Sequence, residues 1–205
     1  MGFMWFGTNI GVNKYDGREF VVYKFNAEDT LGLPSNFISE IFEDSYGILW
    51  VGTFYNGLSR LVRDKDYFRN YAHDKNDSAS ISNNNIREFF EDSRKNLWIG
   101  TAGGGLLLYN RERDNFTTLL NDSVSGNGIG SNYITGIAED KKGFLWLASP
   151  EGVLTRFDPV TRTGKTFHLY PDNVTDRLTT TFGMVYVDSE DNVWCGSEIG
   201  LFRYD

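Results

Sequence analysis

A near-constant spacing of tryptophans is the feature that most limits what this chain can fold into. The five tryptophans lie 45, 48, 48 and 48 residues apart. Each lies near the start of a similar short motif, such as Leu-Trp-Val-Gly-Thr at residues 49–53. A glycine turn and an apolar run follow the motif. A period of forty to fifty residues with strand-like content is typical of the blades of a β-propeller. The repeated residues are Trp5, Trp50, Trp98, Trp146 and Trp194.

An aspartate also recurs, six residues before the tryptophan in four of the copies. An apolar segment precedes this aspartate, as at residues 37–42, and a polar turn follows it, as at residues 45–47. Because an Asp side chain can accept hydrogen bonds from amides two residues further on, it favours a turn at this place. Each repeat therefore predicts a strand A, the aspartate turn, a strand B with the tryptophan, a glycine turn, a strand C, a polar turn and a strand D. The repeated aspartates are Asp44, Asp92, Asp140 and Asp188.

The predicted fold is all-β: a partial propeller array of about four to five four-stranded antiparallel blades with a 48-residue period. We expect one domain, residues 1–205, in which Trp50, Trp98 and Trp146 are buried between blades. The first blade lacks strand A and the last lacks strand D, which predicts a piece of a longer array with open edges that invite pairing with a second copy. The expected blades are residues 1–34 (partial), 35–81, 82–130, 131–177 and 178–205 (partial).

Composition narrows the possible partners. The net charge is −8 and no basic stripe occurs, which argues against nucleic acid. No apolar run approaches 18 residues, so we expect no membrane contact by this segment, and the first residues enter a strand without a signal peptide. Cys195 takes the place of apolar residues in the other repeats, so we expect a buried and unreactive thiol.

No residues are predicted to be catalytic, to bind a metal or to hold a cofactor. His73 and His168 fall at equivalent strand ends in different repeats and have no second ligand at a suitable spacing. The Glu-Asp pairs at 43–44, 91–92 and 139–140 could look like catalytic carboxylates, but neighbours on a strand point to opposite faces, and their recurrence favours turn capping.

The joined pattern resembles the two-component regulator propeller repeat. Residues 33–36, 43–45, 49–53 and 56–58 carry the resemblance, and the pattern returns from residues 82, 131 and, more weakly, 179. The resemblance implies the periplasmic sensor region of a hybrid two-component system histidine kinase that responds to glycans. The expected partners are then an oligosaccharide or other small ligand and the remainder of the parent sensor protein. Any kinase activity would belong to parts that this chain does not contain.

Alternation of the strands places the B–C turns and the D–A connections on one face of the array, which we call the B–C face. Aromatic rings and amides suit sugars, which offer apolar ring faces and hydroxyl rims. We therefore expect a ligand to bind at this face, although Asn and Ser could simply form the turns that enter each strand. A propeller-type enzyme, such as a polysaccharide lyase or glycoside hydrolase, and a structural interaction scaffold remain alternatives. The predicted ligand-binding residues are Asn36, Phe37, Phe54, Tyr55, Asn56, Asn84, Asn132 and Tyr133.

Overall fold

The computed structural model describes residues 3–121, 128–169, 182–197 and 200–204, and within them it contains strands and no helix. The strands form five antiparallel sheets, which we call blades 1 to 5. Blade 1 contains β1 (Met4–Thr8), β2 (Gly11–Tyr15) and β3 (Phe20–Tyr23); blade 2 contains β4 (Ile38–Glu43), β5 (Leu49–Thr53), β6 (Leu58–Val62) and β7 (Tyr67–Tyr71); blade 3 contains β8 (Ile86–Glu91), β9 (Leu97–Thr101), β10 (Leu106–Asn110) and β11 (Asn115–Leu119); blade 4 contains β12 (Gly136–Glu139), β13 (Leu145–Ala148), β14 (Val153–Asp158) and β15 (Thr163–His168); blade 5 contains β16 (Phe182–Val187), β17 (Val193–Ser197) and β18 (Gly200–Tyr204).

Each blade follows the strand order that the repeat predicts. In blades 2, 3 and 4, every strand pairs with the next along the chain, so the sheets read A, B, C, D. The three strands of blade 1 correspond to B, C and D, and those of blade 5 to A, B and C. The predicted all-β propeller class is therefore confirmed.

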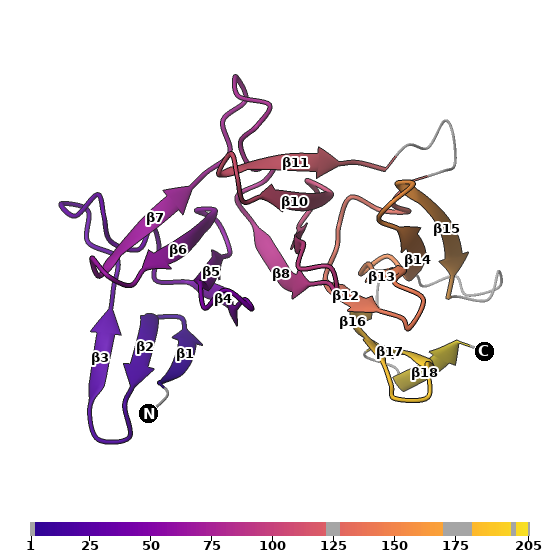
Figure 1. Ribbon diagram of the computed structural model, residues 1–205, viewed down its shortest axis with the longest axis horizontal. Helices are drawn as coiled ribbons and strands as arrows, with labels where there is room; N and C mark the ends of the chain where they lie inside the picture. Colours follow the sequence, from indigo (N-terminus) through magenta and orange to yellow (C-terminus); the bar gives the residue numbers. More distant parts are fainter. Residues whose placement is uncertain (1–2, 122–127, 170–181, 198–199, 205) are drawn as a thin grey trace.

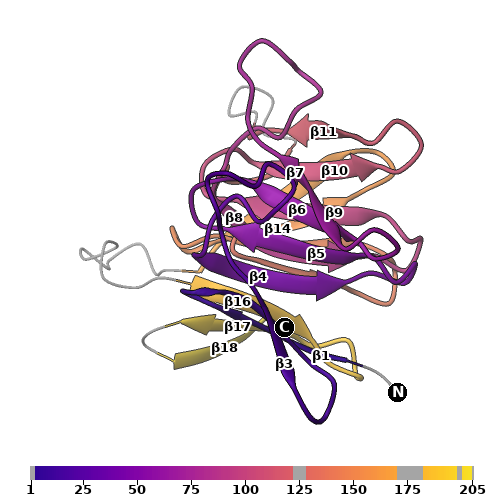
Figure 2. The same cartoon turned by 90° about the vertical axis from the view of Figure 1, so that its left-hand side faces the viewer.

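The five blades fan out along an arc, with β4, β8, β12 and β16 on its inner side and β7, β11 and β15 on its outer side (Figure 1). In the side view, β4, β5, β6 and β7 of blade 2 lie one above the other in this order (Figure 2). Because all inner strands are strand A, their side chains gather around the axis of the arc. The turns at the two ends of the strands form its two faces.

The largest differences from the predicted strand limits lie in blade 4, where the sequence pattern predicts a strand A over residues 133–138 and a strand D over residues 166–170. Strand D begins at Thr163 rather than 166, directly after Arg162, whose φ of 59° is left-handed like that of Asp66 and Asp114 before the D strands of blades 2 and 3. Strand A begins at Gly136 rather than 133, because Tyr133 instead forms an isolated bridge with Ala102 of blade 3. The predicted blade boundary at 177 and the predicted end of strand D at Tyr170 lie outside the described residues.

The core lies between the blades, as expected for a repeat that is apolar on both faces. Trp50, Trp98 and Trp146 are 0%, 1% and 3% exposed, which confirms their predicted burial. Trp50 of blade 2 packs against Tyr109 of blade 3, with ring centroids 4.7 Å apart in an edge-on arrangement. Cys195 is also buried, and this burial raises the pKa of its thiol to about 11, so the predicted unreactive thiol agrees with its surroundings.

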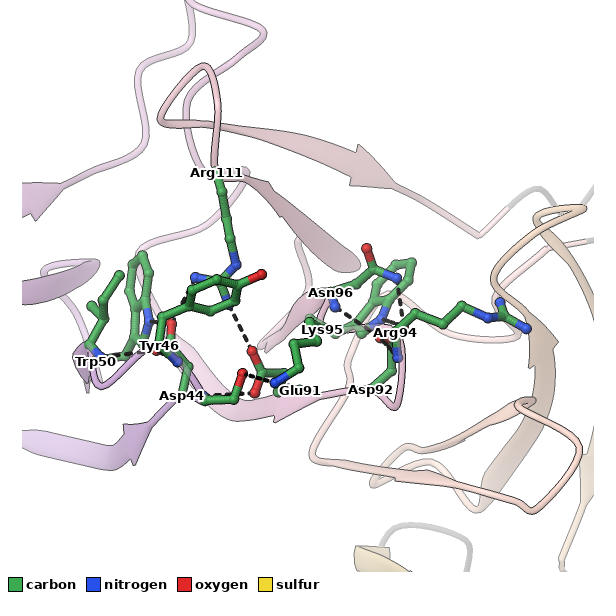
Figure 3. Close-up of polar contacts among 12 residues, drawn as sticks. Asp44, Tyr46, Trp50, Glu91, Asp92, Arg94, Lys95, Asn96 and Arg111 are labelled. Atoms are coloured by element: carbon green, nitrogen blue, oxygen red, sulfur yellow. Dashed lines mark hydrogen bonds and ion pairs between the residues drawn. The ribbon is translucent and has the colours of Figure 1, made fainter.

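The repeated aspartate does more than cap its own turn. Asp44 Oδ1 accepts hydrogen bonds from the N–H groups of Tyr46 and Ile48, as predicted, and Asp44 Oδ2 accepts one from Trp50 Nε1 at 2.9 Å. The same three bonds recur around Asp92, as Figure 3 shows, and around Asp140 and Asp188. One carboxylate therefore fixes both the A–B turn and the orientation of the buried indole.

Candidate ligand-binding face

The B–C turn of blade 2 projects the predicted aromatic residues away from the sheet. Thr53 Oγ1 donates to Gly57 O at 2.8 Å and accepts from Asn56 N–H at 2.9 Å, which ties the turn together. Gly57 has φ +84°, and a Cβ there would lie 2.1 Å from Tyr71 O, so no other residue fits. The turn thus holds Phe54, Tyr55 and Asn56 at its tip, where the Tyr55 side chain is 70% exposed.

Phe37 joins this turn from the start of strand A. Phe54 N–H donates to Phe37 O at 3.2 Å, and the ring centroids of Phe54 and Tyr55 lie 6.2 Å apart. Phe37 is 54% exposed. Three of the predicted aromatic residues are therefore neighbours in the structure.

Arg87, a residue that was not predicted, connects Tyr133 to the same surface. The Arg87 guanidinium carbon lies 5.1 Å from the centroid of the Phe54 ring and 5.6 Å from that of Tyr133, so one cation links rings of blades 2 and 4. Arg87 belongs to β8 of blade 3, between them. The sequence does contain one sign of Arg87, which is a break in the repeat. The equivalent residues 48 positions before and after it are Ser39 and Thr135, which are small and uncharged.

The three predicted asparagines have a shared backbone role. Asn36 Oδ1, Asn84 Oδ1 and Asn132 Oδ1 each accept the N–H of a residue eleven positions earlier, at 2.8, 2.7 and 2.7 Å. This supports the interpretation that asparagine forms the entry to strand A. Within the described part of the chain, however, no protein acceptor takes their Nδ2 groups. These amide donors therefore remain available at the B–C face.

The acidic pairs serve the contacts between blades. Glu91 Oε2 accepts the N–H of Ser45 in the preceding blade at 2.8 Å, and Glu139 Oε2 accepts that of Ser93 at 2.7 Å. Arg111 binds Asp44 Oδ2 at 2.8 Å and Glu91 Oε1 at 2.9 Å and covers the Tyr46 ring (Figure 3). For Asp44, burial raises the pKa, but the Trp50 and Arg111 hydrogen bonds outweigh it and hold the pKa below its ordinary value.

The two histidines lie at or just after the ends of D strands in different blades. His73 Nδ1 lies 2.8 Å from Ile81 O, a backbone contact within its own D–A connection, and His168 is exposed at the end of β15. Among the residues that the structure describes, no three His, Cys, Asp or Glu side chains gather in a way that could hold a metal ion.

Two glutamates on the inner strands have unusual surroundings that the sequence did not reveal. Glu40 Oε2 accepts the Phe89 N–H of the next blade at 2.9 Å. Burial raises the pKa of both Glu40 and Glu88 above its ordinary value, and for Glu40 the neighbouring Glu88 carboxylate raises it further. Glu40 of β4 and Glu88 of β8 thus form a pair of neighbouring carboxyl groups on the inner strands.

The opposite face contains a hollow of about 520 Å³ between blades 4 and 5, whose lining includes Trp146, Phe167 and Tyr204. Between blades 2 and 3, a strand-D ring fills the corresponding place, where Phe116 packs 5.2 Å from Tyr71. Phe167 is the equivalent of Tyr71, because each pairs with the first leucine of strand C, and blade 5 has no strand D. We therefore interpret this hollow as a packing position between blades.

Comparisons with known proteins agree with this architecture. Residues 32–55, 80–103 and 128–151 match the family model described as two component regulator propeller. The fold is similar to the extracellular domain of the hybrid two component system BT3049 from B. thetaiotaomicron, with TM-score 0.84 and 23% identity over 100% of this chain and 27% of that chain. The corresponding domain of BT4673 from the same organism gives TM-score 0.76 and 24% identity over 100% of this chain and 28% of that chain.

The fold is also similar to that of an enzyme. Virginiamycin B lyase from Staphylococcus aureus gives TM-score 0.67 and 13% identity over 99% of this chain and 66% of that chain. No match was found among curated proteins. In the described residues, no helix is long and apolar enough to cross a membrane.

The repeats and their strand order define the class: this is a β-propeller array of antiparallel blades. More particularly, the three matched segments are two component regulator propeller repeats, which confirms the resemblance seen in the sequence. The chain spans about a quarter of the length of the two extracellular domains to which it is similar.

Proposed function

We propose that this chain is a ligand-sensing module in the periplasmic part of a hybrid two-component system, and that its ligand is an oligosaccharide. The repeat family and the similarity to two extracellular sensor domains support the sensor class and a location outside the cytoplasm. The remainder of the parent sensor protein is then its partner. The chain itself performs no catalysis in this proposal.

The ligand binds at the B–C face. The observation that carries this assignment is the juxtaposition of exposed aromatic rings with unused amide donors: Phe37 and Tyr55 are 54% and 70% exposed, and the Asn36 Nδ2 group has no protein acceptor among the described residues. Rings can stack on the apolar faces of a sugar while amides bond its hydroxyl groups. The contact of rings from blades 2 and 4 with Arg87 supports this assignment, because it joins aromatic surface from separate blades.

The test is oligosaccharide binding by variants of the two faces. We expect Tyr55→Ala combined with Tyr133→Ala to weaken binding on a glycan array about tenfold or more, because each removes a stacking surface. Tyr46→Ala combined with Arg94→Ala alters the opposite face as a matched control and should leave binding unchanged. Loss of binding in the control pair alone would place the site on the opposite face.

The same samples test the enzyme alternative. We expect no glycan cleavage product after prolonged incubation. Turnover that disappears in His73→Ala or His168→Ala would contradict the sensor proposal and favour a lyase or hydrolase, the class to which one structural neighbour belongs.

A further inference from the structure

Arg87 breaks the repeat at a place where the backbone is irregular. The pairing of β8 with β9 shifts register between Ile86 and Glu88, so Arg87 sits in a β-bulge. The same shift occurs in blade 2 at Ser39, a small residue. A bulge bends a strand and re-aims one side chain. Here the re-aimed side chain is a long cation on the inner strand of the middle blade.

The contacts of the Arg87 guanidinium in the described part of the chain are aromatic. It lies over the Phe54 and Tyr133 rings, and among the described residues it forms no hydrogen bond and no carboxylate lies within ion-pair distance. Its Nε is buried without a partner. A buried donor left without an acceptor costs free energy, so structures rarely retain one that nothing satisfies. Two rings hold this guanidinium in place, and its donors are unused.

We propose that Arg87 makes the B–C face selective for oligosaccharides that carry an acidic group, either a carboxylate or a sulfate. This inference rests on the proposed function, since it specifies the sugar that the same face binds. A guanidinium presents paired donors that match a carboxylate or sulfate, and it is less strongly hydrated than an ammonium group. The flanking rings can contact the sugar that carries the acid.

The charges around Arg87 are compatible with an anion. The Glu40 and Glu88 carboxyls lie on the adjacent inner strands, and burial raises the pKa of both. At a given pH they therefore carry less negative charge than two ordinary carboxylates would, and they repel an acidic ligand less. The exposed rings of Phe37 and Tyr55 add no charge to the surface.

The experiment compares acidic oligosaccharides with neutral versions of the same backbone. Oligogalacturonides and their carboxyl-reduced products test the carboxylate, and chondroitin sulfate oligosaccharides and their desulfated products test the sulfate. We expect the 205-residue chain to bind at least one acidic probe at least tenfold more tightly than its neutral partner, with affinity that falls as salt is added.

Arg87→Gln should remove this preference and lower acidic-probe affinity about tenfold or more, while any neutral-probe binding remains. Arg87→Lys keeps the charge but loses the paired donors, and should retain part of the preference even if Arg87→Gln folds poorly. Arg94→Gln, an exposed arginine in the A–B turn of the same blade, removes the same charge and should have no effect.

The outcomes separate the two proposals. Equal binding of acidic and neutral probes, or an unchanged preference in folded Arg87→Gln, overturns the role of Arg87 and leaves the glycan-binding face intact if Tyr55→Ala still weakens binding. Binding of no oligosaccharide of either kind contradicts the proposed function, and the acidic selectivity fails with it. Near-ultraviolet circular dichroism of the buried tryptophans confirms the fold of each variant.

Discussion

At the scale of single residues, the structure extends what the sequence implies about the repeated aspartate. Turn capping by Asp44 was predictable, because its spacing to a turn repeats and its short acceptor suits nearby amides. The bond to Trp50 Nε1 was not, because it depends on how strand B returns alongside strand A. Trp5 has no aspartate six residues before it, and its Nε1 is buried without a partner among the described residues.

Arg87 marks the limit of prediction for the candidate site. The rings at Phe54 and Tyr133 were predicted to lie on one face, and the structure does bring them to one cation. That cation could not be assigned from the sequence, because its contacts come from the blades before and after its own. Its unusual position rests on a bulge, and a bulge depends on strand pairing rather than on local pattern.

The inner-strand carboxyls lead to a prediction about pH. The pKa of Glu40 is raised above 4.5 in the folded chain, so the folded state binds more protons than the unfolded one. The free energy of unfolding should therefore be highest near pH 4.5 and fall as the pH rises through the raised pKa. Glu40→Gln keeps an acceptor for Phe89 N–H but cannot ionise. We expect it to stabilise the chain by about 1–2 kcal/mol at pH 9, measured by urea unfolding, and to flatten the pH dependence.

The control for this pH effect is Glu112→Gln, which makes the same change at an exposed turn of blade 3. This variant should show the same pH dependence of the free energy of unfolding as the wild type. A wild-type stability that rises between pH 6 and 9, or a Glu40→Gln profile parallel to wild type, would show that the Glu40 carboxyl is not held in its neutral form.

At the scale of strands and blades, the fold was predictable because the same sequence pattern occurs in every repeat. Hydrophobic alternation gives the strands, glycine and aspartate give the turns, and the constant period gives the blade. The clearest deviation falls where one copy departs from the others: Tyr133 of blade 4 pairs with Ala102 of blade 3 instead of joining strand A. This pairing depends on the neighbouring blade, which the local pattern does not specify.

The coupling of blades 2 and 3 gives a prediction at this scale. Arg111 of blade 3 binds Asp44 of blade 2, whose side chain is fully buried, and Glu91 of its own blade. Removing the cation leaves a buried carboxylate with less compensation. We expect Arg111→Met to lower the free energy of unfolding by about 1–3 kcal/mol and to speed hydrogen exchange at the Ser45 and Tyr46 amides. Arg113→Met, in the same turn but exposed, should change neither.

At the scale of the whole molecule, the two end blades expose surfaces that the inner blades bury. Phe20 of blade 1 is 59% exposed, whereas its equivalent in blade 2, Phe68, is 3% exposed. Leu201 of blade 5 is 67% exposed, whereas its equivalent Leu58 is fully buried. These surfaces are the two complementary halves of a contact between successive blades. They favour head-to-tail association through another blade of the same kind.

We therefore predict that the 205-residue chain associates with itself as its concentration rises. Light scattering coupled to gel filtration should show a mass that increases with loading, and Phe20→Asp or Leu201→Asp should shift the chain toward the monomer, because a charge would be buried in the contact. Val160→Asp is the matched control, since Val160 is 69% exposed but lies in a C–D turn away from both ends. A chain that stays monomeric at every concentration would contradict the prediction, and an equal effect of the Val160 variant would attribute the association to general surface hydrophobicity. Because each end surface needs the opposite end of another copy, mixing the Phe20 and Leu201 variants should restore dimers and no larger species.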